Sequence, residues 1–203
     1  NVAVFFTDYE DIQRSIIVPG SAGGSVVTVL TNAAEAEITG VEVEIWYNPI
    51  DELSIFLTAG YQDFEYQEFD SFAQDGETII DRSDEDTGLP ELQTSLSVRY
   101  DTSLSGGQQL GVQVDYVWVD EGNISPTSTV QNVTRRDSFG RVNARIDLAF
   151  GEGYRLSLWG KNLNDEEFLA GGTDFSGNLG HTIGVIGRPR TYGLTLSKNF
   201  GAE

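Results

Sequence analysis

The stretch LGVQVDYVW, residues 110–118, decides the fold. Apolar side chains take every second position, and polar or small side chains begin the complementary series. The apolar series is Leu110, Val112, Val114, Tyr116 and Trp118, and the complement begins with Gly111, Gln113 and Asp115. An alternation of period 2 predicts a β-strand with one apolar face and one wet face.

The same alternation recurs in residues 41–47, 53–61, 96–100 and 142–150. Charged residues stand on the second face of several of these segments, among them Glu42, Glu44, Arg99, Arg141 and Arg145. Charges on that face indicate water there rather than a dry core between two sheets. Several segments end in Tyr, Trp or Phe, and aromatic residues collect at the two surfaces of a bilayer. The pattern therefore predicts strands that cross a membrane.

Three further segments are less regular. Residues 2–12 carry apolar side chains on both faces, through Val4, Phe5 and Phe6, so the lipid side of this strand stays open. In residues 154–163, Trp159 falls on the polar face. A last strand is expected at residues 191–200. Together these make about eight strands of roughly 10 residues, each covering roughly 25 Å of the membrane normal.

The lengths of the connections alternate along the chain. Long loops are expected at residues 19–25, 64–90, 120–138 and 164–188. Short turns are expected at Asn48, Pro49 and Asp51, at Gly106 and Gly107, and at residues 151–153. In an up-and-down meander this order places every long loop on one rim, as in outer-membrane barrels. In a Greek-key sandwich there is no reason for long and short connections to alternate.

The amino-acid composition excludes several classes of function and of site. The 203 residues contain 32 Asp and Glu against 12 Lys and Arg, a net charge of -20, which disfavours nucleic-acid binding. Without cysteine there is neither a disulfide nor a thiolate metal site. No apolar run approaches the 18 residues of a membrane-spanning helix. Asn1 leads directly into a strand-like run with no signal peptide, so we expect a piece of a longer protein.

Several stretches resemble the C-terminal barrel of TonB-dependent receptors. Residues 1–14 are similar to a strand that leads into an outer loop. Asn32–Ala36 followed by Gly40–Glu44 resembles the "N-A-…-G-V-E" return strand. Trp159–Phe168 resembles the "K-N-L-x-D-x-x-Y" strand end, and Gly187–Leu194 resembles the "G-x-P-R-T-Y-G" segment before the final strand. These stretches follow the order of the family and span essentially the whole chain.

The resemblance implies an all-β fold, an antiparallel up-and-down transmembrane β-barrel segment. Its eight or so strands would belong to a 22-strand barrel, with residues 1–203 forming the C-terminal portion and the plug domain and signal peptide absent. It also implies a receptor of the Gram-negative outer membrane that imports a ferric siderophore, cobalamin or glycan fragment. Implied partners are outer-membrane lipid, the TonB complex through the absent plug, the barrel assembly machinery and a small-molecule ligand such as a metal chelate.

The end of the chain departs from the family pattern. Such barrels commonly finish with an aromatic residue, whereas here Phe200 is followed by three more residues. Lys198 also occupies a position in the lipid-facing series, near the periplasmic rim, where a long cation reaches the interface at little cost. By resemblance, Tyr192, Leu194, Leu196 and Phe200 form the strand recognised by the assembly machinery.

Catalysis finds little support, and we expect no enzyme, no cofactor and no bound metal. The single histidine, His181, stands in the last long loop and has no Ser-His-Asp spacing around it. Asp81, Asp84, Glu85 and Asp86 offer oxygen ligands for Ca²⁺, but their spacing is not that of an EF-hand, and a solvated acidic loop is the competing interpretation.

Ligand binding by the loops is a hypothesis about exposed side chains. Phe72 and Phe175 are candidates for stacking on a ligand, and His181 for contacting one, against the alternative that they are ordinary loop residues. Arg99, Arg141 and Arg145 are expected to face the lumen, where a plug or a bound anion would pair with them.

The second function hypothesis is a complete eight-stranded barrel that acts as a structural anchor or adhesin, since eight strands are enough to close. An outer-membrane enzyme and a soluble β-protein are further alternatives.

Overall fold

The computed structural model describes residues 1–19, 26–72, 78–84, 88–124, 134–175 and 180–200. Over these residues the chain is all-β and antiparallel. In this part of the chain we find no helix with the length and apolarity needed to span a bilayer. The eight long strands follow one another in a single sheet: β1 (Val2–Pro19), β2 (Val26–Ile50), β3 (Leu53–Phe72), β5 (Leu92–Ser103), β6 (Gln109–Val119), β9 (Phe139–Phe150), β10 (Tyr154–Lys161) and β13 (Thr191–Lys198).

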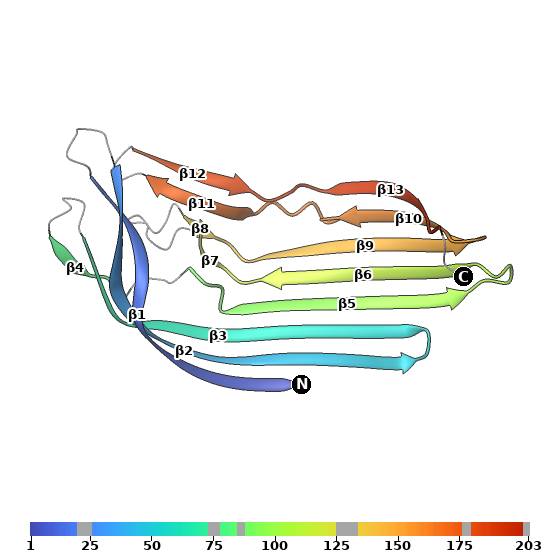
Figure 1. Cartoon of the computed structure of the whole chain (residues 1–203), viewed down its shortest axis with the longest axis horizontal. Helices are drawn as coiled ribbons and strands as arrows, with labels where there is room; N and C mark the ends of the chain where they lie inside the picture. Colours follow the sequence, from blue (N-terminus) through green and yellow to red (C-terminus); the bar gives the residue numbers. More distant parts are fainter. Residues whose placement is uncertain (20–25, 73–77, 85–87, 125–133, 176–179, 201–203) are drawn as a thin grey trace.

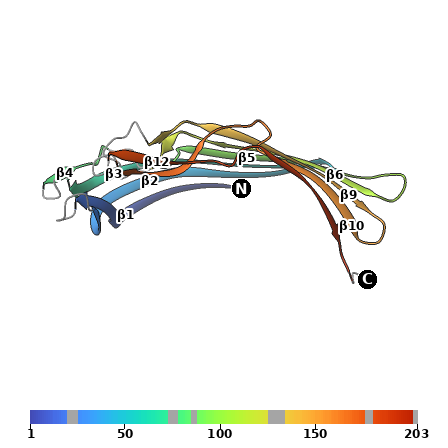
Figure 2. The ribbon, with the colours of Figure 1, turned by 90° about the horizontal axis from the view of Figure 1, so that it is seen from above.

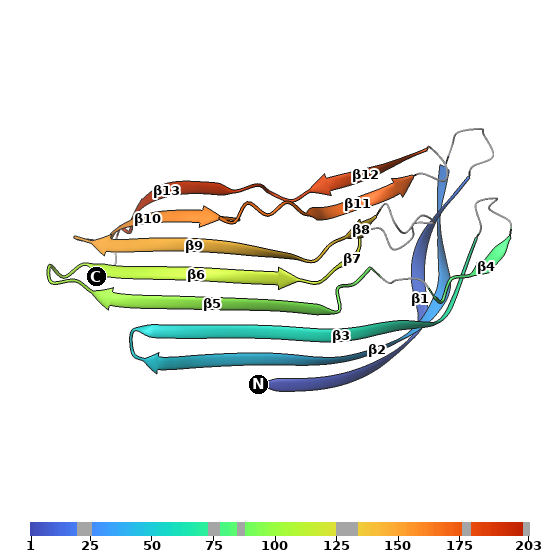
Figure 3. The ribbon, with the colours of Figure 1, turned by 180° about the vertical axis from the view of Figure 1, so that it is seen from behind.

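The sheet is an up-and-down meander with every strand paired to its neighbour in the chain order just given. Figure 1 shows the short connections β2–β3, β5–β6 and β9–β10 at one end and the long connections at the other. The view from behind shows the same order of strands (Figure 3), and Figure 2 shows that the sheet is curved. The predicted alternation of long and short connections is confirmed.

The sheet is open. Among the described residues, β1 pairs only with β2, and β13 pairs only with β10, so these two strands form opposite edges. The alternative of a complete barrel closed by these eight strands is therefore wrong for this chain. Its sheet is a segment of wall, as expected of a larger barrel.

One face of the sheet is continuously apolar because residues paired across antiparallel strands share a face. The register places Val43 opposite Ala59, Val98 opposite Val114, and Val114 opposite Ala144. Farther along, Leu158 lies between Ile146 and Leu194. These side chains are not sealed in an interior: Val114 is 43% exposed and Leu194 is 67% exposed. Such exposure contradicts a soluble sandwich and fits a surface covered by lipid.

Pairing also settles the lipid side of the first strand. Val2 lies opposite Val43 and Val4 opposite Val41, so both belong to the apolar face. Phe5 lies opposite Gly40 on the polar face, and a Cβ built on Gly40 would stand 2.3 Å from the Cζ atom of Phe5. The glycine thus leaves room for a ring that crosses from the neighbouring strand.

Aromatic residues border the apolar face at both ends. Near the short turns are Tyr47, Tyr100, Phe150 and Tyr154. Near the long connections are Phe6, Tyr61, Tyr116, Trp118 and Tyr192. Two such belts, with aliphatic side chains between them, are the arrangement of a membrane-spanning barrel wall.

The first three strands are longer than predicted. They contain 18, 25 and 20 residues, because the backbone pairing continues beyond the apolar face into segments expected to be loops. A small core of Ala34, Ala36, Tyr66 and Phe69 stabilises this extension, with Phe69 only 1% exposed. Alternation alone did not reveal it, since Phe64, Tyr66 and Phe69 do not keep period 2.

The other long connections also contain short strands. β4 (Ile79–Asp81) pairs with β3, and β7 (Gly122–Asn123) pairs with β8 (Arg135–Arg136). β11 (Leu169–Phe175) and β12 (His181–Ile186) form a hairpin where a Gly-rich loop was predicted. The predicted short turns are close to the observed ones, although β2 continues through Pro49 to Ile50.

The two faces of β2 provide a test by substitution. Val43→Arg places a cation in the middle of the apolar face, and we expect it to lower the free energy of unfolding in lipid vesicles by about 2–4 kcal/mol. Val114→Arg should behave alike. Chemical denaturation of protein inserted in vesicles measures the change.

The matched control is Glu42→Arg, which introduces the same side chain one residue away, on the exposed polar face. We expect it to cost less than about 1 kcal/mol. Equal losses at residues 42 and 43 would contradict the assignment of the faces.

Candidate functional site

The polar face of the sheet is the candidate lumen wall. Its central row crosses the sheet through paired residues, namely Ser54, Arg99, Gln113, Arg145, Trp159 and Gly193. The neighbouring row toward the short turns contains Asp101, Gly111, Asp147, Ser157 and Thr195. Alternating polar positions of adjacent strands therefore bring cations and carboxylates side by side.

These residues form a connected ionic network. The guanidinium of Arg99 donates to both oxygens of Asp101 at 2.7 Å, and that of Arg145 donates to both oxygens of Asp147 at 2.8 Å. Asp147 is only 7% exposed and also accepts a hydrogen bond of 2.5 Å from the Ser157 hydroxyl. Arg99 Nη1 lies 3.9 Å from Asp147 Oδ2 and joins the two pairs. The wall neutralises its own charge here.

Two of the three lumen arginines thus have partners within the sheet. Arg99 and Arg145 do not need a plug or an anion to balance them, contrary to the expectation from sequence. Arg141 differs: it has no carboxylate within ion-pair distance among the described residues, and its Nε atom is buried without a hydrogen-bond partner. Of these three cations, only Arg141 lacks a carboxylate partner among the described residues.

Arg141 belongs to an aromatic and cationic cluster at the long-connection end of the wall. The rings of Phe139 and Phe168 stack with their centroids 4.1 Å apart and an angle of 8° between their planes. The guanidinium of Arg141 lies 5.0 Å from the Phe168 centroid, and that of Arg136 lies 5.3 Å from the Phe139 centroid. We call Arg136, Phe139, Arg141 and Phe168 the mouth cluster.

A pocket of about 550 Å³ opens beside the mouth cluster. Phe139, Phe168, Leu169 and Ile186 supply its apolar lining, and Arg135, Arg136, Asp137, Ser138, Glu166 and Glu167 the polar lining. Arg135 is paired with Glu121, whereas Arg136 donates to the Asp120 carbonyl oxygen at 3.2 Å and keeps its Nε atom buried without a partner. Burial lowers the pKa of Arg136 from its usual value, although a guanidinium remains charged at neutral pH.

The two C-terminal motifs meet at the same end of the wall. Asn162, buried and with a positive φ of 51°, donates to the carbonyl oxygens of Glu166 at 2.9 Å and Arg188 at 3.1 Å. Its Oδ1 atom accepts from the Glu166 N–H at 2.9 Å. The amide therefore joins the chain leaving β10 to the chain that enters β13.

Two more contacts reinforce this junction. Arg190 Nη2 lies 3.0 Å from Asp165 Oδ2, an ion pair between the two motifs. The Trp159 indole covers Gly193, where an added Cβ would stand 2.5 Å from Trp159 Cζ2, and its Nε1 donates to Thr195 Oγ1 at 3.1 Å. Trp159 falls outside the apolar series because it packs on the polar face of the neighbouring strand.

The predicted loop candidates lie apart from the mouth cluster. Phe175 and His181 face each other across the β11–β12 hairpin with ring centroids 5.8 Å apart, and neither lines the pocket described above. Phe72 ends β3 opposite Ile79, and its side chain lies outside the described part of the chain. A role of these three residues in ligand binding stays a prediction.

The acidic segment after β4 is described only in part. Asp81 accepts a hydrogen bond of 2.9 Å from the Ser83 N–H, and this bond lowers the pKa of the Asp81 carboxyl. The stabilisation it provides is therefore present at neutral pH and lost as the pH falls through that lowered pKa. Glu85 and Asp86 lie outside the described residues. No grouping of three or more possible metal ligands occurs among the residues that are described.

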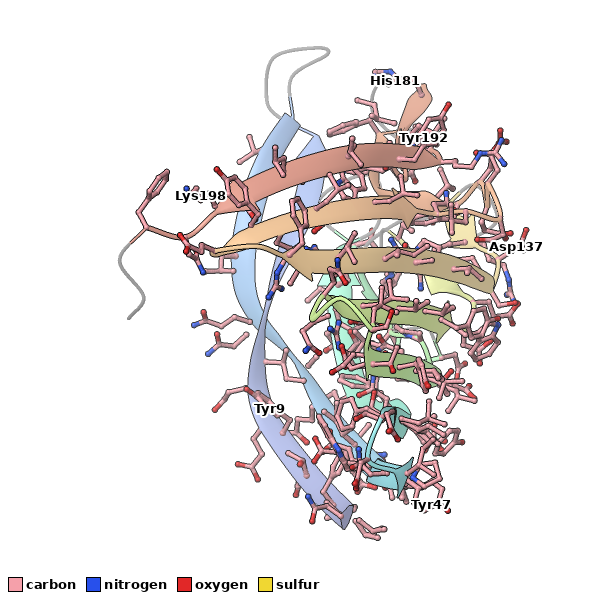
Figure 4. The ribbon with its side chains drawn as sticks, turned by 90° about the vertical axis from the view of Figure 1, so that its right-hand side faces the viewer. Tyr9, Tyr47, Asp137, His181, Tyr192 and Lys198 are labelled. Atoms are coloured by element: carbon pink, nitrogen blue, oxygen red, sulfur yellow. The ribbon has the colours of Figure 1, made fainter. Side chains whose placement is uncertain are left out.

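On the final strand, Tyr192, Leu194 and Leu196 follow the lipid-facing register of β10, while Phe200 lies beyond the end of β13. Figure 4 looks at the sheet from the short-turn end and labels Tyr192 and Lys198 on this strand. The alternation predicted for β13 is present. Recognition by the assembly machinery stays a prediction.

Comparison with known proteins agrees with this geometry. The sequence profile described as "TonB dependent receptor-like, beta-barrel" matches residues 1–163. The chain belongs to the TonB-dependent receptor family. The family consists of transport receptors, and a wall with an ionic lining and two aromatic belts agrees with this.

Solved structures of such receptors share the fold at low sequence identity. The ferric yersiniabactin uptake receptor FyuA from Yersinia pestis matches with a TM-score of 0.72 and 16% identity over 98% of this chain. The siderophore receptor PiuA and the ferric preacinetobactin receptor BauA, both from Acinetobacter baumannii, match with TM-scores of 0.69 and 0.64, each at 18% identity, over 96% and 98% of this chain. The chain spans 27%, 25% and 27% of those three chains, about a quarter of a receptor.

Of the mouth cluster, only Arg141 was predicted from the sequence, as a lumen-facing cation, and the stacking of Phe139 on Phe168 was not predicted. Phe139 and Phe168 stand in segments predicted as loop or strand end, and their stacking depends on pairing across a connection of many residues. The junction at Asn162 is different, because Asn162, Asp165 and Arg190 all lie in the family motifs. Their contact across 25 residues joins the two motifs in space.

Asn162→Ala should weaken the junction. The substitution removes three side-chain hydrogen bonds and places alanine at a positive φ, so we expect the free energy of unfolding of the full-length receptor to fall by about 2–4 kcal/mol. Urea unfolding of the detergent-folded receptor, followed by tryptophan fluorescence, measures the loss.

Glu167→Ala is the control for that experiment, since Glu167 is exposed and nearby, and a change within about 0.5 kcal/mol is expected. If both variants unfold like the parent receptor, the motif residues do not hold the strand ends together.

Proposed function

We propose that this chain forms part of the wall of an outer-membrane receptor that imports a nutrient complex, with ferric siderophores as the foremost substrate class. Cobalamin and glycan fragments are the alternatives. The observation that supports this is an open sheet with lipid-facing apolar residues on one side and a self-neutralised ionic wall on the other. A sheet of that kind separates a bilayer from a polar passage.

The substrate class is supported by the neighbours. Three of them are a ferric yersiniabactin uptake receptor, a siderophore receptor and a ferric preacinetobactin receptor. Their identity to this chain is below 25%, so the class rather than any individual siderophore is carried over. The receptor is proposed to lie in the outer membrane of a Gram-negative bacterium.

The rest of the receptor is proposed from the family. Residues 1–203 are the C-terminal portion of a barrel of about 22 strands. A plug domain, encoded elsewhere in the full sequence, fills the lumen and is moved by the TonB complex. The assembly machinery inserts the barrel through the strand containing Tyr192, Leu194 and Leu196. The wall supplied by this chain positions the ligand and carries out no chemical step on it.

The mouth cluster is the proposed point of ligand contact in this chain. Its two guanidinium groups have no carboxylate within ion-pair distance among the described residues, and a stacked pair of rings lies beneath them. Guanidinium groups recognise carboxylates and other planar anions by paired hydrogen bonds, and aromatic faces accept flat groups. Many metal chelates present both kinds of surface.

Arg141→Gln tests this contact. Loss of one charge-assisted hydrogen-bonding group is worth about 1.5–3 kcal/mol, so we expect the receptor to bind its ferric siderophore roughly 10–100 times more weakly. Fluorescence titration of the purified full-length receptor with ferric siderophore from the producing organism's own iron-limited medium measures the affinity.

Arg155→Gln is the matched control, because it removes the same charge from the polar face near the short turns. We expect its affinity to stay within about twofold of the parent. If the two variants weaken binding equally, the mouth cluster is not the contact.

The transport function itself is tested in cells. A strain without the receptor should lose TonB-dependent uptake of ⁵⁵Fe supplied as the native siderophore complex, and the full-length gene should restore it. Labelled cyanocobalamin serves as the parallel substrate. If the strain keeps iron uptake but loses cobalamin uptake, cobalamin replaces ferric siderophores as the substrate. If it loses neither uptake, both substrate classes are refuted.

A further inference from the structure

A cation interrupts the lipid-facing side of the final strand. Lys198 lies opposite Tyr154 in the register of β10 and β13, one step beyond the Leu156–Leu196 pair. Both residues therefore share the face of Leu194, Leu196 and Leu158, which otherwise contacts hydrocarbon. Lys198 is the last residue of β13 and lies at the end of the sheet where the short turns are, beside the start of β10 (Figure 4).

Aromatic rings hold this cation in place. Lys198 Nζ donates to the Tyr154 hydroxyl at 3.2 Å and lies 4.5 Å from the Tyr154 ring centroid and 5.1 Å from the Phe200 centroid. Phe150 stacks against Tyr154, with centroids 5.8 Å apart and planes 15° apart. Phe200 is 85% exposed, so the second ring borders the cation without covering it.

Hydrogen-bond donors remain at this position. An ammonium group has three N–H donors, and the contact with Tyr154 uses one. The Tyr154 hydroxyl accepts that bond and keeps its own O–H free to donate. No carboxylate lies within ion-pair distance of Lys198 among the described residues. Two N–H groups of Lys198 and the O–H group of Tyr154 therefore have no hydrogen-bond acceptor in the described part of the chain.

The position of Lys198 and Tyr154 in the membrane indicates which acceptor their free donors bind. It faces lipid, and it lies at the height of the aromatic belt beside the short turns, where the headgroups of a leaflet begin. The anion present at that depth on the lipid side is the phosphate of a phospholipid. The adjoining Leu196 and Leu194 side chains continue along the sheet where an acyl chain would run.

We propose that Lys198 and Tyr154 bind the phosphate of an anionic phospholipid of the periplasmic leaflet, with Phe200 and Leu196 against its upper acyl segment. This site is on the opposite face of the wall from the passage for the imported ligand. Its function is to fix the depth of the final strand in the bilayer. The inference rests on the membrane orientation and not on the identity of the transported substrate.

Lipid retention by the full-length receptor tests the site. The receptor is equilibrated in mixed micelles containing phosphatidylglycerol and phosphatidylcholine, and bound lipid is counted by native mass spectrometry. We expect Lys198→Gln to reduce retained phosphatidylglycerol about fivefold, since one basic residue at a membrane surface contributes about 1 kcal/mol. Tyr154→Phe, which keeps the ring and removes the donor, should reduce it about twofold.

The matched control is Lys161→Gln, which removes the same charge at the other end of β10, on the polar face. Its phosphatidylglycerol retention should equal that of the parent receptor. Added inorganic phosphate should not displace the lipid, because the acyl contacts belong to the site. If inorganic phosphate alone displaces phosphatidylglycerol, the site binds free anions rather than a lipid, and the proposal is overturned.

Two further outcomes would also overturn the proposal. One is equal retention in the parent and in both Lys198→Gln and Tyr154→Phe, with the heat-modifiable gel migration of folded barrels intact. The other is equal loss in Lys198→Gln and Lys161→Gln, which would mean a general charge effect. Ferric siderophore uptake by the Lys198→Gln receptor should be unchanged at saturating ligand, so failure of the lipid site and failure of the proposed transport function are separable.

Discussion

Backbone pairing between neighbouring antiparallel strands is the constraint on which the rest of this structure depends. In lipid, an unpaired N–H or C=O group costs several kcal/mol, so every spanning strand must pair along its length. Pairing fixes the register, and a shift of one residue would exchange the two faces of a strand. Val43, Val114 and Leu158 face lipid together, and Arg99, Arg145 and Asp147 face away together, for that one reason.

The same register explains the ionic wall. Charges on the polar face lie at fixed spacings, so Arg99 meets Asp101 two residues along its own strand and Asp147 from two strands away. The carboxylates that balance Arg99 and Arg145 therefore belong to the same sheet. Near the long connections, Arg136 and Arg141 pack on Phe139 and Phe168 and have no carboxylate within ion-pair distance among the described residues.

Much of this fold follows from the sequence. Alternation predicted the eight strands and, except for the first strand, their polar and apolar faces. Four stretches, among them those around Asn162 and Arg190, resemble the family to which the chain belongs. The extension of β1 to β3 was not predicted, because Phe64, Tyr66 and Phe69 follow the bulges of an irregular ladder rather than period 2. In the mouth cluster, the stacking of Phe139 and Phe168 was not predicted either, since it depends on three-dimensional folding of a long connection. Arg141 of the same cluster was predicted as a lumen-facing cation.

The long paired extension of the first three strands has a consequence for the ligand capture proposed above. A flexible loop that closes on a ligand loses roughly 1–2 kcal/mol of backbone entropy for each residue it orders. In β2, the ladder to β1 and β3 already fixes residues 34–38 before any ligand arrives. The outer mouth on this side is thus preorganised, and binding energy there goes into affinity rather than into ordering the chain.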